Sequence, residues 1–272
     1  MLFRSADYER GLTADIMKYP WQSETCIGAW HYLRFLYEKP GEYGGYQNPR
    51  EVVHWLIDTV SKNGTFILNV PGRPDGTIDS KEVAVLDGIT SWMEVNGEAI
   101  YETRPWKISG EGPNMIKAGS FQGESVNKLG EKDIRFTRNK ANTVIYAIVL
   151  GWPSEPITVK SLGLSAATTP GKIGRVELLG TDVRLDWKQP ADALQVQLPK
   201  NYRPKVDYAA ALLRPRTENL ARLQQLDGGR PVAQLSAIGA RLRGEHAHKL
   251  VPGIGRECRK LVHRKISSDG SR

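Results

Sequence analysis

The chain has 272 residues but only two cysteines, Cys26 and Cys258. They lie in different sequence contexts and have no metal-ligand spacing, so we expect no disulfide framework. Cys26 is expected to be a buried thiol rather than a nucleophile. The sequence also lacks any apolar run close to the roughly 18 residues that a membrane-spanning helix needs, and its first residues contain no apolar signal core. What remains is a chain long enough to bury one large domain or two ordinary ones.

An excess of positive charge is missing from most of the chain, although the formal net charge is +8. Residues 213–272 contain 13 Lys and Arg against 5 Asp and Glu, whereas residues 1–212 contain 25 of each. An excess of positive charge over a protein is typical of nucleic-acid binding. Here the basic excess lies in a tail without aromatic residues to stack on bases, so we do not expect a nucleic-acid partner.

The basic tail is predicted to be poorly ordered, because it is Arg-rich and has Gly and Pro breaks between short apolar patches. Two interpretations remain open for it. The first is sequence that is not native to the protein, as a frameshift or run-on translation would produce. The second is a basic arm that binds nucleic acid or another anionic surface.

A helix, a strand and a second helix are predicted between residues 52 and 95. Apolar residues recur at helical spacing from Val52 to Val60, and this helix is predicted to end with Gly64 in the left-handed conformation. Residues 65–70, TFILNV, are predicted to form a strand buried on both faces. A PGRPDG loop and a helix over residues 80–95 follow, with Asp79 or Ser80 as the helix cap. Strand, loop and helix make the repeating unit of a (β/α)8 barrel, in which chemistry lies on the loops after the strands.

Two polar segments precede these elements. Residues 7–11 read DYERG, and residues 19–32 read YPWQSETCIGAWHY. The second segment mixes aromatic, histidine and carboxylate side chains without amphipathic periodicity. Such a mixture fits a carbohydrate site, where flat aromatic faces stack on a sugar and polar groups bond its hydroxyls. A tryptophan-rich core loop is the alternative interpretation.

The hydrophobic period changes near residue 133. Short alternating segments at intervals close to ten residues predict an antiparallel β-sandwich, and they read IRFTRNKANTVIYAIVLGW, ITVKSLGL, IGRVELLG, VRLDWKQ and ALQVQLP. Residues 106–127 are Gly-rich and lack periodicity, so we predict a linker there. Trp152 and Trp187 are expected to pack in the core or at an interface rather than on a sugar.

Four ordered motifs resemble the α-L-fucosidases of glycoside hydrolase family 29. They read DYERG, PWQSETCIGAWHY, SKNGTFILNVPGRPDGTID and NGEAIYETRPW. The resemblance implies the C-terminal part of a (β/α)8-type catalytic barrel over residues 1–122 and an antiparallel β-sandwich over residues 123–212. The basic tail, residues 213–272, would follow them. The last two motifs are expected to be barrel scaffold rather than catalytic residues.

The resemblance also implies a retaining exo-glycosidase that releases terminal α-L-fucose from glycans without a metal or cofactor. The family's nucleophile is an aspartate on an earlier barrel strand, with no counterpart in residues 1–272, so we expect this chain alone to be inactive. Glu9 is ranked first as the acid/base and Glu24 second, while Trp30, His31 and Tyr32 are the candidate sugar contacts.

Several of these assignments have alternatives. Glu9 in a salt bridge with Arg10 or Arg4 is one, and His31 as a core histidine is another. For the whole chain, the alternative is a non-catalytic carbohydrate-binding or structural β-sandwich module. The expected partner is a fucosylated glycan, with no membrane, and the resemblance adds that such enzymes are often secreted or periplasmic.

Overall fold

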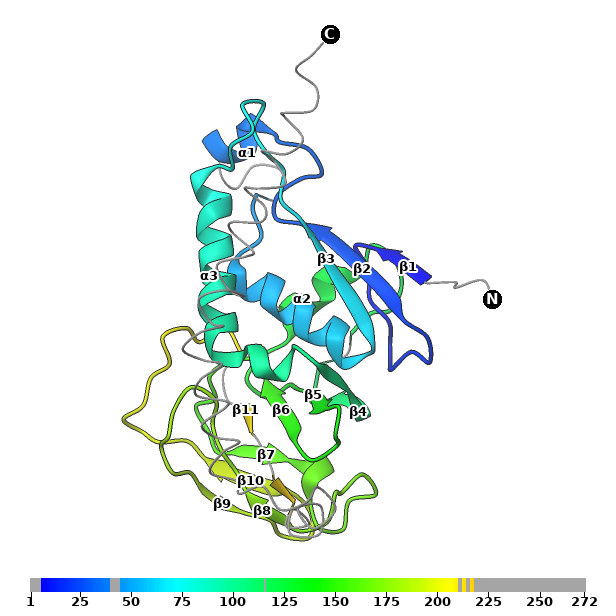
Figure 1. The fold of residues 1–272 in the computed structure, drawn as a ribbon, viewed down its shortest axis with the longest axis vertical. Coiled ribbons are helices and arrows are strands. Elements are labelled where there is room, and N and C mark those ends of the chain that lie inside the picture. The colour runs from blue at the N-terminus through cyan, green and yellow to red at the C-terminus, as the bar shows by residue number, and fades with distance from the viewer. Residues whose placement is uncertain (1–5, 40–44, 115, 210–211, 214–215, 218–272) are drawn as a thin grey trace, which may run out of the picture.

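The computed structural model describes residues 6–39, 45–114, 116–209, 212–213 and 216–217. A parallel sheet with three helices forms one part, and antiparallel strands form the other (Figure 1). The predicted disorder of the basic tail concerns residues that lie almost wholly outside this description, as does Cys258. Among the described helices, none has the length and hydrophobicity needed to cross a membrane.

The parallel sheet has the strand order β1-β2-β3. Its strands are β1 (Ala6–Glu9), β2 (Trp21–Cys26) and β3 (Gly64–Asn69). The helices are α1 (Arg34–Glu38) and α2 (Pro49–Ser61), which connect β2 to β3, and α3 (Ser80–Asn96), which follows β3. This confirms the predicted strand-to-helix units of a (β/α)8-type barrel, of which the described residues contain three strands.

The start of α2 is fixed by a capping box. The Asn48 side chain accepts a hydrogen bond from the Glu51 backbone N (3.0 Å), and the Glu51 carboxylate accepts one from the Asn48 backbone N (2.8 Å). Pro49 occupies the first helical turn, where its missing N–H leaves no hydrogen bond unmade. Of the apolar positions that predicted the inner face, Val52, Val53 and Ile57 are buried, whereas Leu56 and Val60 are half-buried. Trp55, which the periodicity did not select, is buried as well.

The prediction of Gly64 as a left-handed helix cap was wrong. Asn63 takes that conformation, with φ of 71°, and its side-chain amide donates to the Met17 carbonyl at 3.1 Å. Asparagine tolerates this conformation because its short polar side chain bonds locally. Gly64 begins β3 instead, and a Cβ atom there would lie 2.6 Å from the Trp21 indole. Close packing, rather than a positive φ, therefore requires glycine at this position.

The prediction that this strand is buried on both faces was also wrong. In β3, Thr65 is exposed and Ile67 is 40% exposed, while Phe66 between them is half-buried. The strand lies at the edge of the described sheet, and α2 packs against one of its faces (Figure 1). Residue composition identifies a strand but does not say what covers each of its faces.

The antiparallel strands confirm the β-sandwich. One sheet has the order β11-β6-β5-β4, a second has the order β7-β10-β9, and β8 pairs with β12. Their bounds are β4 (Thr103–Glu111), β5 (Ile134–Asn139), β6 (Ile145–Val149), β7 (Ile157–Val159), β8 (Ile173–Arg175), β9 (Asp186–Lys188), β10 (Leu194–Gln197), β11 (Leu212–Leu213) and β12 (Arg216–Thr217). The 3₁₀ helices are η2 (Gly97–Ala99), η3 (Gly123–Lys128) and η4 (Lys160–Leu162).

The linker predicted over residues 106–127 begins with a strand. β4 pairs antiparallel with β5, with a register shift between Pro105 and Gly110. A Cβ atom at Gly110 would lie 2.3 Å from the Ile134 carbonyl oxygen, so this glycine marks close approach of two strands rather than a flexible loop. The boundaries at residues 122 and 212 stay predictions, and strands β4 and β11 join the sandwich sheet from beyond them.

A shared apolar core joins the two parts of the molecule. Trp55 of α2 and Trp92 of α3 belong to the same buried cluster as Tyr146 and Ile148 of β6. The Trp92 indole N–H also donates to the Ala209 carbonyl at 2.6 Å. Helix and sandwich residues therefore bury one another, and neither part is covered by its own elements alone.

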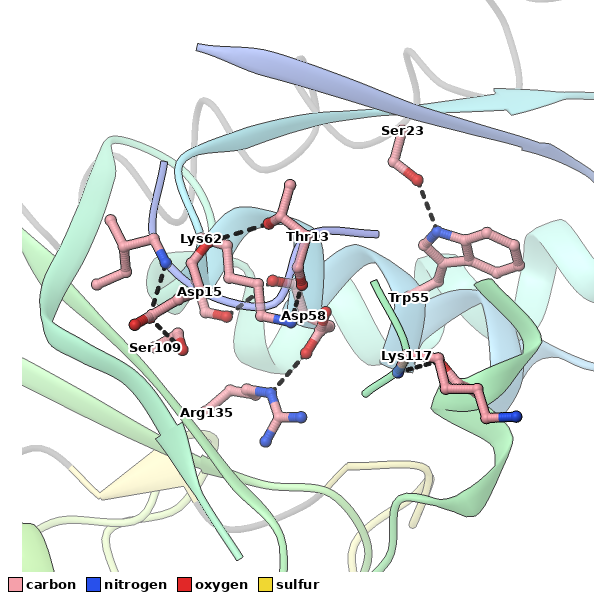
Figure 2. Close-up of polar contacts among 12 residues, drawn as sticks. Thr13, Asp15, Ser23, Trp55, Asp58, Lys62, Ser109, Lys117 and Arg135 are labelled. Carbon is pink, nitrogen blue, oxygen red and sulfur yellow. Dashed lines mark hydrogen bonds and ion pairs between the residues drawn. The ribbon is translucent and has the colours of Figure 1, made fainter. Parts of the chain in front are cut away.

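A buried ion-pair network crosses the same junction (Figure 2). The Asp58 carboxylate on α2 accepts from the Lys62 Nζ at 2.7 Å and from the Arg135 Nε at 2.6 Å. The Lys62 Nζ also donates to the Thr13 carbonyl at 2.8 Å. All three charged side chains are more than nine-tenths buried. Burial lowers the pKa of Lys62, and Asp58 opposes that shift by favouring the charged ammonium.

We predict that Asp58→Asn lowers the free energy of unfolding by roughly 3–5 kcal/mol, because it leaves two buried cations without their carboxylate. Urea unfolding followed by tryptophan fluorescence measures this loss. The matched control is Glu102→Gln, which breaks the exposed pair between Glu102 and Lys140 (3.4 Å). An exposed pair is worth at most about 1 kcal/mol. Equal losses in the two variants would contradict the role assigned to Asp58.

Candidate active site

The face of the β1–β2–β3 sheet that points away from α2 is the candidate site, and we call it the open face. Strand residues alternate between faces. Ser23 faces α2, because its hydroxyl accepts a hydrogen bond from the Trp55 indole N–H at 2.7 Å. Trp21 faces the same way and donates its indole N–H to the Lys62 carbonyl at 2.9 Å. Glu24, one residue after Ser23, therefore lies on the open face.

Glu9 and Glu24 are direct register partners across the parallel pair β1 and β2. Register partners share a face, so Glu9 lies beside Glu24, and Asp7, two residues earlier in β1, lies on the same face. Glu9 and Asp7 are exposed and Glu24 is half-buried. Burial raises the pKa of Glu24, and the neighbouring carboxylates of Asp7 and Glu9 raise it further. The sheet thus places the two predicted catalytic glutamates side by side.

The alternative salt bridge from Glu9 to Arg10 is absent among the described residues. Arg10 pairs instead with Glu124 of η3. Its backbone takes a positive φ of 44°, and its carbonyl accepts from the Gly123 backbone N at 2.8 Å. These contacts hold the arginine to the η3 segment, so it does not neutralise Glu9. Arg4, the other proposed partner, lies outside the described residues.

The predicted sugar-contact residues follow the end of β2. Trp30 is 38% exposed, His31 is exposed and Tyr32 is half-buried. His31 is therefore not a core histidine, and that alternative is wrong. The buried histidine is His54 on α2, whose Nε2 lies 2.6 Å from the Tyr208 carbonyl and whose pKa burial lowers to about 4. Cys26 at the end of β2 is 3% exposed, as expected for a buried thiol.

Two residues that the sequence reasoning did not select hold this aromatic segment in place. Asn69, the last residue of β3, donates through Nδ2 to the Ala29 carbonyl (3.3 Å) and the Trp30 carbonyl (3.1 Å). Arg73 lies over the ring of Tyr32, 5.8 Å from its centroid, and its Nε donates to the Tyr32 hydroxyl at 3.3 Å. Two features of the sequence could have identified them: Asn69 is a polar residue at the end of a strand, and Arg73 lies in the loop after that strand, where barrel enzymes place functional residues.

A buried acidic pair lies behind these loops at the start of α3. The Asp79 carboxylate caps the helix by accepting from the backbone N of Lys81 (2.8 Å) and Glu82 (2.9 Å). It also accepts from the Tyr46 hydroxyl at 2.6 Å. Glu82 is 1% exposed, and its carboxylate oxygens make no side-chain hydrogen bond among the described residues. Burial raises the pKa of Glu82 to about 7, and Asp79 adds to the rise.

The folded protein resembles solved α-L-fucosidases. It superposes on the Thermotoga maritima α-fucosidase in complex with fucose with a TM-score of 0.56 and 26% identity, covering 77% of this chain and 42% of that one. It also matches α-L-fucosidase isoenzyme 1 from Paenibacillus thiaminolyticus with a TM-score of 0.58. At 22% identity over 78% of this chain and 45% of that one, this second likeness shows the fold alone.

The sequence matches the same family. A sequence model described as alpha-L-fucosidase matches residues 3–98, and one described as alpha-L-fucosidase C-terminal domain matches residues 127–214. The plasma alpha-L-fucosidase of Rattus norvegicus is 31% identical over 60% of this chain and 31% of the relative. The human plasma alpha-L-fucosidase is 30% identical over 62% of this chain and 32% of the relative.

These matches identify a glycoside hydrolase class with a barrel-type catalytic part followed by a β-sandwich. The two sequence models together cover more than half of the chain in the expected order, and the chain belongs to the α-L-fucosidase family. It spans about a third of the length of the curated relatives that it matches.

We predict that Asn69→Ala loosens the aromatic segment without unfolding the protein. Each lost hydrogen bond is worth about 1 kcal/mol, so global stability changes little while amide exchange in residues 28–33 speeds up by about tenfold. Hydrogen–deuterium exchange read by mass spectrometry measures this. Thr65→Ala, on the same strand with an exposed side chain, is the control and leaves the exchange of this segment unchanged. Unchanged exchange in Asn69→Ala would contradict the assigned role.

The buried carboxyl group of Glu82 makes the stability of the folded chain depend on pH. Its pKa rises from 4.5 to about 7 in the folded chain, so the folded state holds a proton that the unfolded state releases. Stability is therefore full below about pH 4.5 and falls as the pH rises to about 7. Glu82→Gln removes this loss and stabilises the protein at pH 8 by up to about 3 kcal/mol relative to its effect at pH 4.5.

Urea unfolding of both proteins at pH 4.5 and pH 8 measures this difference. The control is Glu94→Gln, a change at an exposed position on the same helix, which gives the same small effect at both pH values. A Glu82→Gln effect that does not depend on pH would contradict the assignment of a buried, proton-holding carboxyl group.

Proposed function

We propose that this chain takes part in the hydrolysis of terminal α-L-fucose from glycans by a retaining mechanism. The observation that carries the proposal is the register pair of Glu9 and Glu24 on the open face, at the carboxyl ends of strands in a barrel-type sheet. The α-fucosidase of Thermotoga maritima has been solved with fucose, which supports fucose as the sugar. A fucosylated glycan is the substrate class proposed here.

Glu24 is proposed as the acid/base. Such a group must hold a proton near neutral pH to protonate the leaving oxygen. The half-buried position of Glu24 and its two acidic neighbours favour the protonated form, whereas Glu9 is exposed at the end of β1. The sequence ranked Glu9 first; we now propose that Glu9 acts by keeping the pKa of Glu24 high.

The proposed mechanism needs a second carboxyl group, the nucleophile, roughly 5–5.5 Å from the acid/base. Following the family resemblance, we propose that a barrel strand other than β1, β2 and β3 supplies it. Trp30, His31 and Tyr32 are proposed to contact the sugar, since aromatic faces stack on its apolar side. Their position after the end of β2, beside the loop that contains Arg73, supports this role.

The second candidate function is a non-catalytic carbohydrate-binding module. It is favoured by the open face of the three-stranded sheet, where Glu9 and Asp7 are exposed. In that case the aromatic segment would still bind fucose, but no bond would be broken. The two candidates therefore differ in turnover and agree in binding.

Hydrolysis of 4-nitrophenyl α-L-fucoside distinguishes them. We expect no turnover by this chain alone, and turnover when it is refolded with the part of the rat plasma relative that it does not cover. In that complex Glu24→Gln lowers kcat by at least about 100-fold. The loss is larger for a fucosyl disaccharide, whose leaving group needs the proton more.

Glu9→Gln tests the proposed division of roles. Removing its negative charge lowers the pKa of Glu24, so activity is lost at a lower pH on the alkaline side while kcat at acidic pH changes little. Thr65→Ala on the same face serves as the control. Fucose binding without turnover in the complex would favour the non-catalytic module, and equal losses for both fucosides in Glu24→Gln would overturn its role as the acid.

A further inference from the structure

Charge is unevenly distributed along residues 1–212, and the positive excess in the sandwich part has no role in the proposed fucose chemistry. Residues 1–126 contain 12 Lys and Arg against 17 Asp and Glu, and residues 127–212 contain 13 against 8. Residues 1–126 are therefore net −5 and residues 127–212 net +5, which the neutral sum over residues 1–212 conceals. An acidic ligand is drawn to the sandwich and repelled by the open face.

Part of this charge lines one hollow of about 830 Å³ on the sandwich. Two loops form it: residues 152–155, which follow β6, and residues 197–207, which follow β10. Lys200, Arg203 and Lys205 line it, and all three are exposed. Two carboxylates, Glu155 and Asp207, also line it, so the hollow keeps one positive charge in excess.

The three cations are available to a ligand. Within the described residues, none of them forms an ion pair, and the Arg203 guanidinium makes only one hydrogen bond, to the Tyr202 carbonyl at 3.3 Å. A second hollow, of about 460 Å³, adjoins the first at Pro153 and Glu155. It has two lysines against three glutamates, so it lacks the excess of positive charge that the first hollow has.

The lining of the hollow includes one aromatic side chain. Trp152 lines it and packs against the Tyr202 ring, with centroids 5.7 Å apart, and both rings are half-buried against the sandwich core. The Glu131 carboxylate fixes the loop by accepting from the Ser154 backbone N (2.9 Å) and hydroxyl (3.0 Å). The sequence expectation that Trp152 packs on the core is met, and this half-buried ring lines the same hollow as the three cations.

We propose that this hollow binds an anionic saccharide, with the sugar ring on Trp152 and its sulfate or carboxylate group on Arg203 and Lys205. An aromatic ring and exposed cations in the lining of one hollow match both chemical features of such a ligand. Arg203 offers a planar pair of donors that a single oxyanion group fits. This site lies on the sandwich and does not depend on the proposed fucosidase activity.

Fluorine NMR of the full chain labelled with 5-fluorotryptophan tests the site, with Trp152→Phe assigning the Trp152 signal. The probes are sialyllactose for the carboxylate, a sulfated heparin disaccharide for the sulfate, and neutral lactose as the control. We expect an acidic probe to shift the Trp152 signal saturably, and lactose to shift it at least about tenfold more weakly.

The charge requirement is tested with a matched pair of double variants. The double variant Arg203→Gln with Lys205→Gln lowers the affinity for the acidic probe by about tenfold or more. Arg184→Gln with Lys188→Gln removes the same charge from exposed positions outside the hollow and changes affinity less than about twofold. The basic tail is present in every protein, so its contribution cancels.

Each result of these titrations either supports or overturns the proposed site. A response to sialyllactose alone or to the sulfated probe alone supports the site and names its anion. Equal effects of the two double variants, an equal response to lactose, or an unmoved Trp152 signal would each overturn the proposal. Tighter binding of a short oligonucleotide than of either acidic sugar would overturn the assignment to a saccharide.

Discussion

A buried ion-pair network centred on the Asp58 carboxylate joins helix α2 to the sandwich. Asp58 is wholly buried on α2, and it compensates one cation from its own helix, Lys62, and one from the sandwich, Arg135 (Figure 2). Because a charge without its partner is costly in the interior, the three groups are stable only together. The helix and strand β5 therefore have one mutual orientation, and the apolar cluster around Trp55 and Tyr146 packs within it.

That orientation determines where chemistry is possible. α2 covers one face of the three-stranded parallel sheet, through Trp55 and Ser23, so the residues that alternate with Ser23 lie on the other face. The register then brings Glu9 beside Glu24. The backbone N–H groups of Phe121 and Gly123 donate to the carbonyls of Glu9 (2.9 Å) and Arg10 (2.8 Å), which holds the end of β1 against the η3 segment. The ion pair between Arg10 and Glu124 removes the nearest cation from this face. Like charges remain close together, and this arrangement raises the pKa of a carboxylic acid.

Sequence patterns predicted the helices and strands better than they predicted which residues contact one another in the folded chain. Helical periodicity identified α2 and α3, and alternation identified the sandwich strands, because both signals are local. β4 was missed because its glycine, Gly110, allows close contact with β5, a partner more than twenty residues away. In the site, the motifs selected Glu9, Glu24 and Trp30, whereas Asn69 and Arg73 act through backbone carbonyls and ring faces that only the folded chain brings near.

The net charge of the sequence likewise does not show how charge is distributed between the parts of the folded chain. Residues 1–212 have no net charge, yet residues 1–126 are net −5 and residues 127–212 net +5. A neutral fucose is indifferent to this separation, whereas an acidic glycan is not, since opposite potentials at two ends orient a charged chain. An anionic branch held near Trp152 and a neutral fucose end at the open face would therefore experience no conflict of charge. Together the two proposals assign selection of the glycan by its acid groups to the sandwich and hydrolysis of the neutral fucose to the barrel part.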